Sequence, residues 1–466
     1  MGAARSGIAC AKFLAARGAT VALNDSKSLE DWSAEALDLK SQGVGILPGD
    51  IPGWLLDQTE LLVISPGVPT TAIPIRYAER AGAEVIGEVE LASRYLKGRI
   101  AAITGSNGKT TTTSLIGALL TNAGIPTQVG GNIGTPLISM VETSSDDGWT
   151  VVEMSSFQLE TIREFHPAIA VVLNVTPNHM DRYESFTDYA AAKHRIFMNQ
   201  VPGDLAVLNA DDEIVSSWAT GLRAHVSNFS VKRELDEGLF LRGREIVSRT
   251  ATGERVLLRS DEMKLRGRHN VENVLAALTV GLACGAAPES MRQTVNEFEP
   301  VEHRLELVSE IDGVKFYNDS KATSVDATLK ALEAFDDVEE ENSAESGKVV
   351  LILGGRGKKA PYAPLASLVR HNVRKLILIG EDADTIVTQL GDSAPYDRAQ
   401  DMKDAVELSF EAAKPGDTVL LAPACASFDM FESFEHRGRV FKDEVQKLKS
   451  KVQSPKSKVV LPDMDS

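Results

Sequence analysis

The stretch 103–112, Ile-Thr-Gly-Ser-Asn-Gly-Lys-Thr-Thr-Thr, carries the residue types and spacing of a loop that binds nucleotide phosphates. It follows a short apolar run and precedes a helix-like segment at 114–120. Its two glycines allow backbone N–H groups to approach phosphate oxygens, Lys109 supplies a positive charge, and the Thr110 hydroxyl suits Mg²⁺. The common pattern has a glycine where this chain has Ile103, so the loop is a shorter variant. The pattern favours nucleotide binding over a glycine-containing turn with a coincidental lysine.

Two further candidate ligands follow predicted buried strands. Glu153 ends the apolar run 149–153, and His179 follows the run 169–175. Because the carboxyl ends of parallel strands meet at one edge of a sheet, both side chains are expected near the phosphate loop. Glu153 is a candidate Mg²⁺ ligand, although a solvated glutamate at a strand end fits the pattern equally well. The position of His179 between two polar residues at a strand end favours a functional role.

Three other polar residues have less specific patterns. Lys193 lies in a predicted helix at 188–198, and by spacing alone it is an ordinary exposed lysine. Asn132 lies in the glycine-rich segment 130–134, which is predicted to be a loop rather than the interior of an element. Asn270 lies just before a predicted helix, one helical turn from a second asparagine. It could therefore contact the edge of a base or cap the helix.

The N-terminal region has the pattern of a Rossmann-like unit. A glycine turn at 2–7 is followed by a helical run and by a strand that ends at Asp25. Such a turn should follow a first strand, and only Met1 precedes it, so we expect either a lost strand or a true start upstream. An alanine replaces the middle glycine, which disfavours a dinucleotide site. The strand that ends in the Pro/Gly segment 65–69 predicts a rigid ligand-binding loop.

Composition excludes several classes of protein. The chain has 466 residues and a net charge of −17, which argues against a nucleic-acid-binding protein. Its three cysteines show no metal-ligand spacing and fit a reducing compartment. No apolar stretch is long enough to span a membrane, and no signal peptide is recognisable. We therefore expect a cytoplasmic protein without membrane insertion, and a monomer.

Alternating strands and helices predict an α/β protein with three domains. We expect a Rossmann-like domain at 1–97 whose first strand is missing, a central phosphate-loop domain at 98–300, and a second doubly wound domain at 301–449. The acidic segment 336–347 and the tail 450–466 are predicted to be disordered.

Several of these segments together resemble the Mur ligases, and most closely their D-glutamate-adding branch. The resemblance covers the chain from residue 2 to about residue 447. The matching segments are 65–69, 104–111, 131–134, 153–160, 174–183, 318–324 and 423–438. The short phosphate loop is this family's own form. The resemblance implies ATP-dependent amide-bond formation between UDP-N-acetylmuramoyl-L-alanine and D-glutamate through an acyl phosphate. The cofactors it implies are ATP and two Mg²⁺ ions.

The resemblance also implies residue roles. Lys109, His179, Lys193 and Lys321 would be catalytic. ATP would contact Gly105, Ser106, Asn107, Gly108, Lys109, Thr110, Thr111, Asn270, Arg304 and Asp319. The Mg²⁺ ligands would be Thr110, Glu153, His179 and Lys193 as a carbamate. The sugar nucleotide would contact Arg5, Ser6, Asp25, Ser26, Gly67 and Asn132, and D-glutamate would contact Lys321, Thr323, Lys358, Ser427 and Phe434.

Three alternatives stay open at this point. One is another amino-acid-adding Mur ligase or a folylpolyglutamate-type ligase. A second is a phosphate-loop motor, transporter or GTPase-like switch, although no partner-sensing segment is apparent. A third is a non-catalytic relative, although the intact Lys109, Glu153, His179 and Lys193 argue against it.

Overall fold

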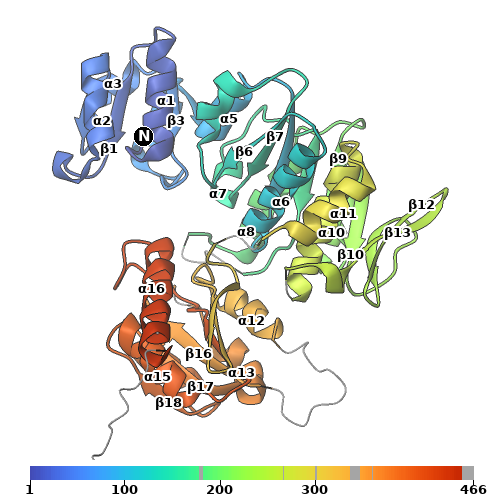
Figure 1. Cartoon of the computed structure of the whole chain (residues 1–466). Helices are drawn as coiled ribbons and strands as arrows, with labels where there is room; N and C mark the ends of the chain where they lie inside the picture. The colour runs from blue at the N-terminus through green and yellow to red at the C-terminus, as the bar shows by residue number, and fades with distance from the viewer. Residues whose placement is uncertain (178–181, 266, 300–301, 336–346, 359, 454–466) are drawn as a thin grey trace, which may run out of the picture. The chain divides into compact units, whose positions relative to one another are not determined.

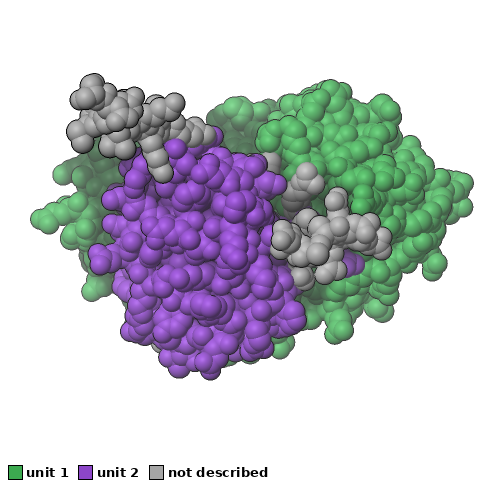
Figure 2. All heavy atoms as spheres, turned by 60° about the horizontal axis from the view of Figure 1, so that its bottom comes forward, with its two compact units in different colours: residues 1–177, 182–265, 270–299 green, residues 178–181, 266–269, 300–466 purple. Residues whose placement is uncertain are grey.

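A computed structural model describes residues 1–177, 182–265, 267–299, 302–335, 347–358 and 360–453. The chain divides into two compact units, coloured separately in Figure 2. Unit 1 comprises residues 1–177, 182–265 and 270–299, and unit 2 comprises residues 178–181, 266–269 and 300–466. Each unit is described by itself.

The centre of unit 1 is a nine-stranded sheet with the order β13-β12-β11-β10-β9-β8-β5-β7-β6 (Figure 1). Its strands are β5 (Arg99–Thr104), β6 (Thr127–Gly131), β7 (Trp149–Glu153), β8 (Ile169–Val172), β9 (Leu205–Asn209), β10 (His225–Ser230), β11 (Gly238–Arg242), β12 (Glu245–Thr250) and β13 (Gly253–Arg259). The strands from β6 to β11 pair in parallel, and β11, β12 and β13 pair antiparallel. The antiparallel strands β11, β12 and β13 thus extend one side of the parallel central sheet.

Apolar side chains on both faces of this sheet explain why its strands read as continuous hydrophobic runs. In β5, Ala101 and Ile103 belong to one core, and Ile100 and Ala102 belong to the core on the opposite face. Helices α6 (Lys109–Asn122), α10 (Arg268–Ala283) and α11 (Pro288–Glu297) cover the first face. The second core includes residues of α1 (Arg5–Ala16), α5 (Glu88–Ser93), α7 (Ser156–Leu159), α8 (Phe186–His194) and α9 (Glu213–Ser217).

The N-terminal part of unit 1 contains two separate two-stranded parallel sheets. One pairs β1 (Ala22–Asp25) with β2 (Gly45–Pro48), and the other pairs β3 (Leu61–Ile64) with β4 (Glu84–Gly87). Met1 and Gly2 bond to both sheets, because the Met1 amine donates to the Val63 carbonyl at 2.6 Å and the Gly2 N–H donates to Asn24 at 2.7 Å. These two residues occupy the position that the glycine-turn pattern predicts for the end of a first strand. The short helices α2 (Ala34–Asp38) and α3 (Gly53–Asp57) and the longer α4 (Ile73–Ala81) complete this part.

Helix α5 is tied to the central sheet region by one buried carboxylate. Glu90 Oε2 accepts the backbone N–H groups of Arg163, Glu164 and Phe165 at 2.8, 3.1 and 3.0 Å. Its other oxygen, Oε1, accepts from Arg94 Nε at 3.2 Å. A buried charge of this kind is stabilised by several convergent donors, so Glu90 fixes the loop after α7 against α5.

Unit 2 contains a six-stranded sheet with the order β14-β15-β19-β16-β17-β18. The strands are β14 (Glu306–Ile311), β15 (Val314–Asn318), β16 (Val349–Gly354), β17 (Val373–Ile379), β18 (Tyr396–Arg398) and β19 (Thr418–Leu421), and only the β14–β15 pair is antiparallel among these. Helices α12 (Val325–Glu333), α13 (Ala366–Asn372) and α14 (Ala383–Leu390) pack on one face, and α15 (Met402–Ala412) and α16 (Phe434–Gln453) pack on the other. The predicted doubly wound α/β architecture is confirmed.

Two local predictions are wrong. Gly130 and Gly131 lie in β6 rather than in a loop, since they pair with Val152 and Glu153 of β7. A Cβ at Gly130 would meet Met140 Sδ at 2.4 Å and Gly131 has a φ of +102°, which explains why both positions are glycine. Helix α16 continues to Gln453, into the segment predicted as a disordered tail. Val445, Leu448 and Val452 extend its apolar stripe at helical spacing.

The acidic segment predicted at 336–347 lies outside the described residues except for its last one. Within the described residues, no helix combines the length and apolar character that crossing a membrane requires.

Glu88, at the start of α5, is a second buried carboxylate of unit 1, and it is poorly compensated. Its Oε1 accepts the Ile138 N–H at 2.7 Å, whereas Oε2 is buried and has no hydrogen-bond partner among the described residues. Burial raises the pKa of Glu88 from 4.5 to about 7, although the backbone hydrogen bonds oppose the shift. Between pH 4.5 and about 7, the folded state therefore keeps a proton on Glu88 that the unfolded state has released.

We expect Glu88→Gln to remove a pH dependence of stability. Since the folded-state pKa is raised, the wild type should lose roughly 3 kcal/mol of unfolding free energy relative to the variant as pH rises from about 4.5 through 7. Urea unfolding at pH 5 and pH 8 would measure this through tryptophan fluorescence. All four tryptophans, Trp32, Trp54, Trp149 and Trp218, lie in unit 1, so the signal reports that unit alone. Glu60→Gln on the surface is the control, and an identical pH slope for Glu88→Gln and wild type would contradict the expectation.

Candidate active site

The predicted phosphate loop connects β5 to α6 at the carboxyl edge of the nine-stranded sheet. Gly108, the residue before α6, has a φ of +82°, a left-handed conformation that favours glycine. The loop is held from the neighbouring strand, because the Ser106 N–H donates to the Asn174 carbonyl at 2.9 Å and the Asn107 N–H donates to Asn174 Oδ1 at 2.8 Å. The start of α6 therefore presents its first backbone N–H groups in a fixed geometry, as an anion site requires.

Lys109 folds back onto the same loop. Its Nζ donates to the carbonyls of Gly105 and Ser106 at 2.8 and 2.9 Å. The ammonium group is thus positioned at the mouth of the loop, where it can attract the outer oxygens of a polyphosphate.

Glu153 and Thr110 meet beside this loop, as the strand order predicts. The Thr110 hydroxyl donates to Glu153 Oε2 at 2.8 Å, and Asn132 Nδ2 donates to Glu153 Oε1 at 2.8 Å. Glu153 is 2% exposed, and the Thr110 hydroxyl and the Asn132 amide are neutral groups. A buried carboxylate next to a hydroxyl oxygen is a donor set that fits Mg²⁺, which prefers oxygen ligands.

Lys193 is buried, which differs from the exposed position that its spacing indicates. Its Nζ donates to the Gly105 carbonyl at 2.8 Å and lies 4.7 Å from the centre of the Tyr189 ring. The hydroxyl of that tyrosine lies 3.1 Å from Ser106 Oγ. Burial, and secondly the charge of Lys109, hold the pKa of Lys193 well below its usual range, although Glu153 opposes the shift.

The asparagine pair at the start of α10 packs against the phosphate loop. Asn273 Nδ2 donates to Asn270 Oδ1 at 3.1 Å, and Asn273 Oδ1 accepts from the Thr112 hydroxyl at 3.2 Å. Asn270 is buried. The pair therefore connects α10 to α6.

Five of the six candidate sugar-nucleotide residues lie in the N-terminal part of unit 1, and the sixth, Asn132, lies beside Glu153. Asp25 Oδ2 accepts the Ala3 N–H at 2.8 Å, and Ser26 follows it on the surface. Arg5 opens α1 and donates to the Gly134 carbonyl at 3.3 Å, with Ser6 next to it in the first turn. The Gly67 loop is bound by Arg182, which donates to the carbonyls of Gly67 and Val68 at 3.4 and 3.2 Å.

In unit 2, a second group of candidate residues gathers where β15 and β19 end. The Leu305 N–H donates to Asp319 Oδ1 at 3.4 Å. Burial raises the pKa of Asp319 to about 7, while the charge of Arg304 acts in the opposite direction. Lys321 Nζ lies 3.8 Å from the centre of the Phe434 ring. Lys358 Nζ donates to Thr323 Oγ1 at 3.5 Å, and Ser427 is buried.

Arg437 is a central residue of this group that sequence reasoning missed. It is 1% exposed, and it donates to Ser320 Oγ and to the carbonyls of Ser320 and Cys425 at 3.0, 2.8 and 3.1 Å. Burial lowers the pKa of Arg437 to about 10. It joins the segment before Lys321 to the segment before Ser427. The available signal was its position between Phe434 and Phe441 on the apolar face of α16, where a charged residue needs dedicated partners.

Three family models match the chain. Residues 1–87 match the "Mur ligase MurD-like, N-terminal domain", residues 103–281 match the "Mur ligase middle domain", and residues 303–425 match the "Mur ligase, glutamate ligase domain". The chain belongs to the Mur ligase family.

Curated relatives and solved structures extend this assignment. Proteins named UDP-N-acetylmuramoylalanine--D-glutamate ligase from Koribacter versatilis and Solibacter usitatus are each 47% identical; the alignments cover 96% of both chains in the first case, and 97% of this chain and 98% of the relative in the second. The crystal structure of UDP-N-acetylmuramate-alanine ligase MurC from Thermotoga maritima matches with a TM-score of 0.59 at 19% identity, over 96% of this chain and 98% of that chain. MurF from Acinetobacter baumannii matches with a TM-score of 0.60 at 16% identity, over 92% of each chain. These structures show the shared Mur ligase fold.

His179, predicted as a metal ligand of this Mur ligase, lies outside the described residues. Among the described residues of unit 1, the structure brings together the phosphate loop, Thr110, Glu153, Asn132 and Lys193. It brings Arg304, Asp319, Lys321 and Phe434 into one region of unit 2.

We expect Gly108→Ala to weaken nucleotide binding in this Mur ligase much more than a second glycine substitution does. A Cβ at Gly108 would lie 2.2 Å from Asn273 Oδ1, and the alanine backbone would have to adopt a φ of +82°. Gly124→Ala is the matched control, because its φ of +77° imposes similar strain and its Cβ meets nothing within 4 Å.

Both variants should lose roughly 1–2 kcal/mol of stability through backbone strain, and Gly108→Ala should lose more through the clash. Titration with a fluorescent ATP analogue would measure the nucleotide affinity, for which we expect a loss of about tenfold or more in Gly108→Ala only. Equal affinities of the two variants would show that the loop tolerates a side chain at 108.

Proposed function

We propose that this Mur ligase adds D-glutamate to UDP-N-acetylmuramoyl-L-alanine with hydrolysis of ATP to ADP and phosphate. The observation that supports this most strongly is the identity of 41–47% to curated UDP-N-acetylmuramoylalanine--D-glutamate ligases over nearly the whole chain. The reaction belongs to the synthesis of peptidoglycan precursors.

The chemistry needs an activated carboxylate. The terminal carboxylate of the sugar nucleotide attacks the γ-phosphorus of ATP, which forms an acyl phosphate and releases ADP. The D-glutamate amine then attacks the acyl carbon, loses a proton, and expels phosphate from a tetrahedral intermediate. Because the phosphorylated carboxylate has a good leaving group, the protein mainly has to position the reactants and neutralise charge.

The residues around the phosphate loop suit the first step. The backbone of Gly105 to Thr111 would cradle the phosphates, and Lys109 would bind their outer oxygens. Thr110 and Glu153 would hold one Mg²⁺, which when bound neutralises charge on the transferred phosphoryl group. Asn270 would contact the adenine, and Arg304 and Asp319 would contact the ribose or phosphates.

Lys193 would serve as a carbamate. Burial favours its neutral amine, and an amine of this form adds to CO₂ with release of one proton. The product is a carboxylate, which can bind a second Mg²⁺ together with His179, whereas an ammonium would repel that ion.

The remaining candidate residues divide between the two other substrates. Lys321 and Lys358 would offset the two carboxylates of D-glutamate, with Thr323, Ser427 and Phe434 completing the pocket. Arg5, Ser6, Asp25, Ser26, Gly67 and Asn132 would bind the sugar nucleotide. A second metal ion, a monomeric state and a cytoplasmic location are further parts of the proposal.

A reconstitution assay tests the proposal directly. With ATP and Mg²⁺, the purified protein should release phosphate only when UDP-N-acetylmuramoyl-L-alanine and D-glutamate are both present. Mass spectrometry should detect the amide product with D-glutamate and not with L-glutamate, L-lysine or diaminopimelate. Phosphate release that is indifferent to the sugar nucleotide would instead indicate a motor or switch, and product with another amino acid would indicate a sister ligase.

Lys193→Ala should reduce the ligation rate by about 100-fold or more, because the second metal would lose a carboxylate ligand. Added bicarbonate should not restore activity, whereas a short-chain carboxylic acid that enters the vacated space should restore part of it. Lys12→Ala, which removes an exposed lysine from α1, is the control and should be unaffected. Full activity of Lys193→Ala would remove the carbamate from the mechanism.

A further inference from the structure

The turn that carries Arg304 has a strained backbone on both sides. His303 has a φ of +66° and Leu305 a φ of +43°, and neither residue is glycine. Conformations of this kind persist only where the surroundings impose them, and they are concentrated at functional sites. The contacts that impose them therefore indicate what the protein needs to hold in place.

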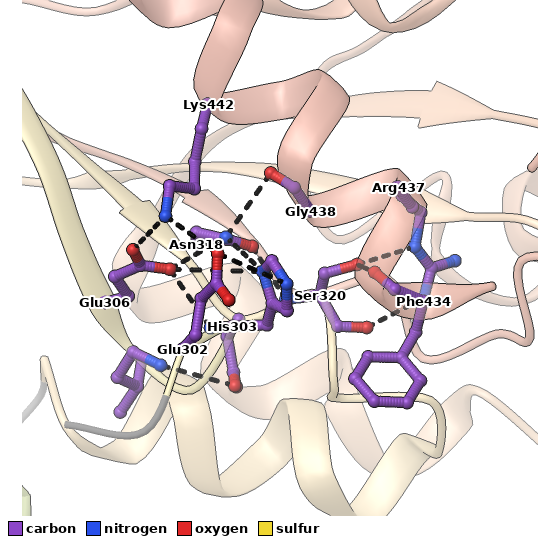
Figure 3. A network of polar contacts seen from close by, with 11 residues as sticks. Glu302, His303, Glu306, Asn318, Ser320, Phe434, Arg437, Gly438 and Lys442 are labelled. Atoms are coloured by element: carbon purple, nitrogen blue, oxygen red, sulfur yellow. Dashed lines mark hydrogen bonds and ion pairs between the residues drawn. The ribbon is translucent and has the colours of Figure 1, made fainter.

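Side chains from β14 and β15 hold the turn from one side (Figure 3). Glu306 Oε2 accepts the His303 N–H at 3.0 Å and Asn318 Nδ2 at 3.1 Å. Asn318 Nδ2 also donates to His303 Nδ1 at 2.9 Å. The imidazole is 2% exposed, and burial lowers the pKa of His303, so a neutral ring that accepts at Nδ1 fits this geometry.

Lys442, on α16, joins the two ends of the turn. Its Nζ donates to Glu302 Oε1 at 3.0 Å and to Glu306 Oε1 at 2.5 Å (Figure 3). The side chains of Lys442 and Glu306 are 30% and 21% exposed, so the charge-assisted bonds are partly shielded from water. Glu302, His303 and Glu306 have the geometry of a metal-binding group, but the ammonium group already bridges its two carboxylates.

We propose that Lys442 is a positioning residue that holds the 302–306 turn so that Arg304 and Asp319 are presented to the nucleotide. The inference rests on the proposed nucleotide contact of these two residues. The chain of contacts runs from Lys442 to Glu306, from Glu306 to the His303 N–H, and from the Leu305 N–H to Asp319. Helix α16 thereby acts on a site that Lys442 itself does not touch.

The turn also contacts the segment that carries the proposed D-glutamate residues. The Lys321 N–H donates to the His303 carbonyl at 3.2 Å. The sugar-nucleotide residues, in contrast, all belong to unit 1. A loss of the Lys442 bridge should therefore affect nucleotide binding and leave sugar-nucleotide binding unchanged.

The test compares Lys442→Met, Lys442→Arg and Lys447→Ala in the full chain. Methionine keeps much of the apolar stem but cannot bridge the carboxylates, and arginine can still bridge them. Lys447→Ala is the matched control, since it removes a lysine–glutamate pair of 2.8 Å from the same helix without touching the turn. Calorimetric titration with Mg²⁺–ADP, and separately with UDP-N-acetylmuramoyl-L-alanine, gives the two affinities, and scanning calorimetry monitors folding.

Lys442→Met should bind ADP about tenfold more weakly, with sugar-nucleotide affinity within about twofold of wild type. Lys442→Arg should recover most of the ADP affinity, and Lys447→Ala should match wild type in both titrations. Unchanged ADP affinity in Lys442→Met, or an equal loss for both ligands, would overturn the inference. These titrations involve no amino-acid substrate, so failure of the D-glutamate assay would be distinguishable from failure here.

Discussion

The amino groups of two lysines, Lys109 and Lys193, converge on one carbonyl oxygen, that of Gly105, and the rest of the site depends on this arrangement. Lys109 and Lys193 both donate to it at 2.8 Å, and Lys193 is almost completely buried. A positive charge on Lys193, buried and close to Lys109, is unfavourable unless negative charge is near, which is why the pKa of Lys193 is lowered. Glu153 supplies part of that charge, and a bound polyphosphate or a carbamate on Lys193 would supply more. The phosphate loop is thus a site whose positive charge is only partly balanced by the protein's own carboxylate.

The residues that the sequence located correctly are those whose position in the fold follows from local pattern. The glycine–lysine–threonine loop and the strand-end Glu153 could be read from a few adjacent residues, because strand, loop and helix follow one another directly. The α/β alternation similarly revealed the two main sheets. In contrast, the burial of Lys193 depends on Tyr189 in its own helix and on Gly105, which is 88 positions away along the chain. The family resemblance singled out Lys193, and spacing could not.

The role of Arg437 and the strand position of the β6 glycines were not predicted, for a related reason. The role of Arg437 is defined by carbonyl groups in two loops that come together only in the folded unit. Gly130 and Gly131 are strand residues whose lack of a side chain is required by the close approach of Met140 and Glu153, not by a turn. The positive φ angles at His303 and Leu305, each costing about 1–3 kcal/mol, have no sequence signature at all. Constraints that come from tertiary packing are thus the part of the site that pattern alone does not contain.

Helix α5 bears on how the modules of this family can be exchanged in evolution. It lies between the segments matched by the N-terminal and middle-domain models, which end at residue 87 and begin at residue 103. Yet the carboxylate of Glu90 in this helix accepts three successive N–H groups of the middle segment, 163–165. A recombination event that replaced the first module and α5 together would leave these donors without their carboxylate. Successful chimaeras should therefore inherit α5 with the middle module, so the heritable boundary lies before Glu88 rather than at the phosphate loop.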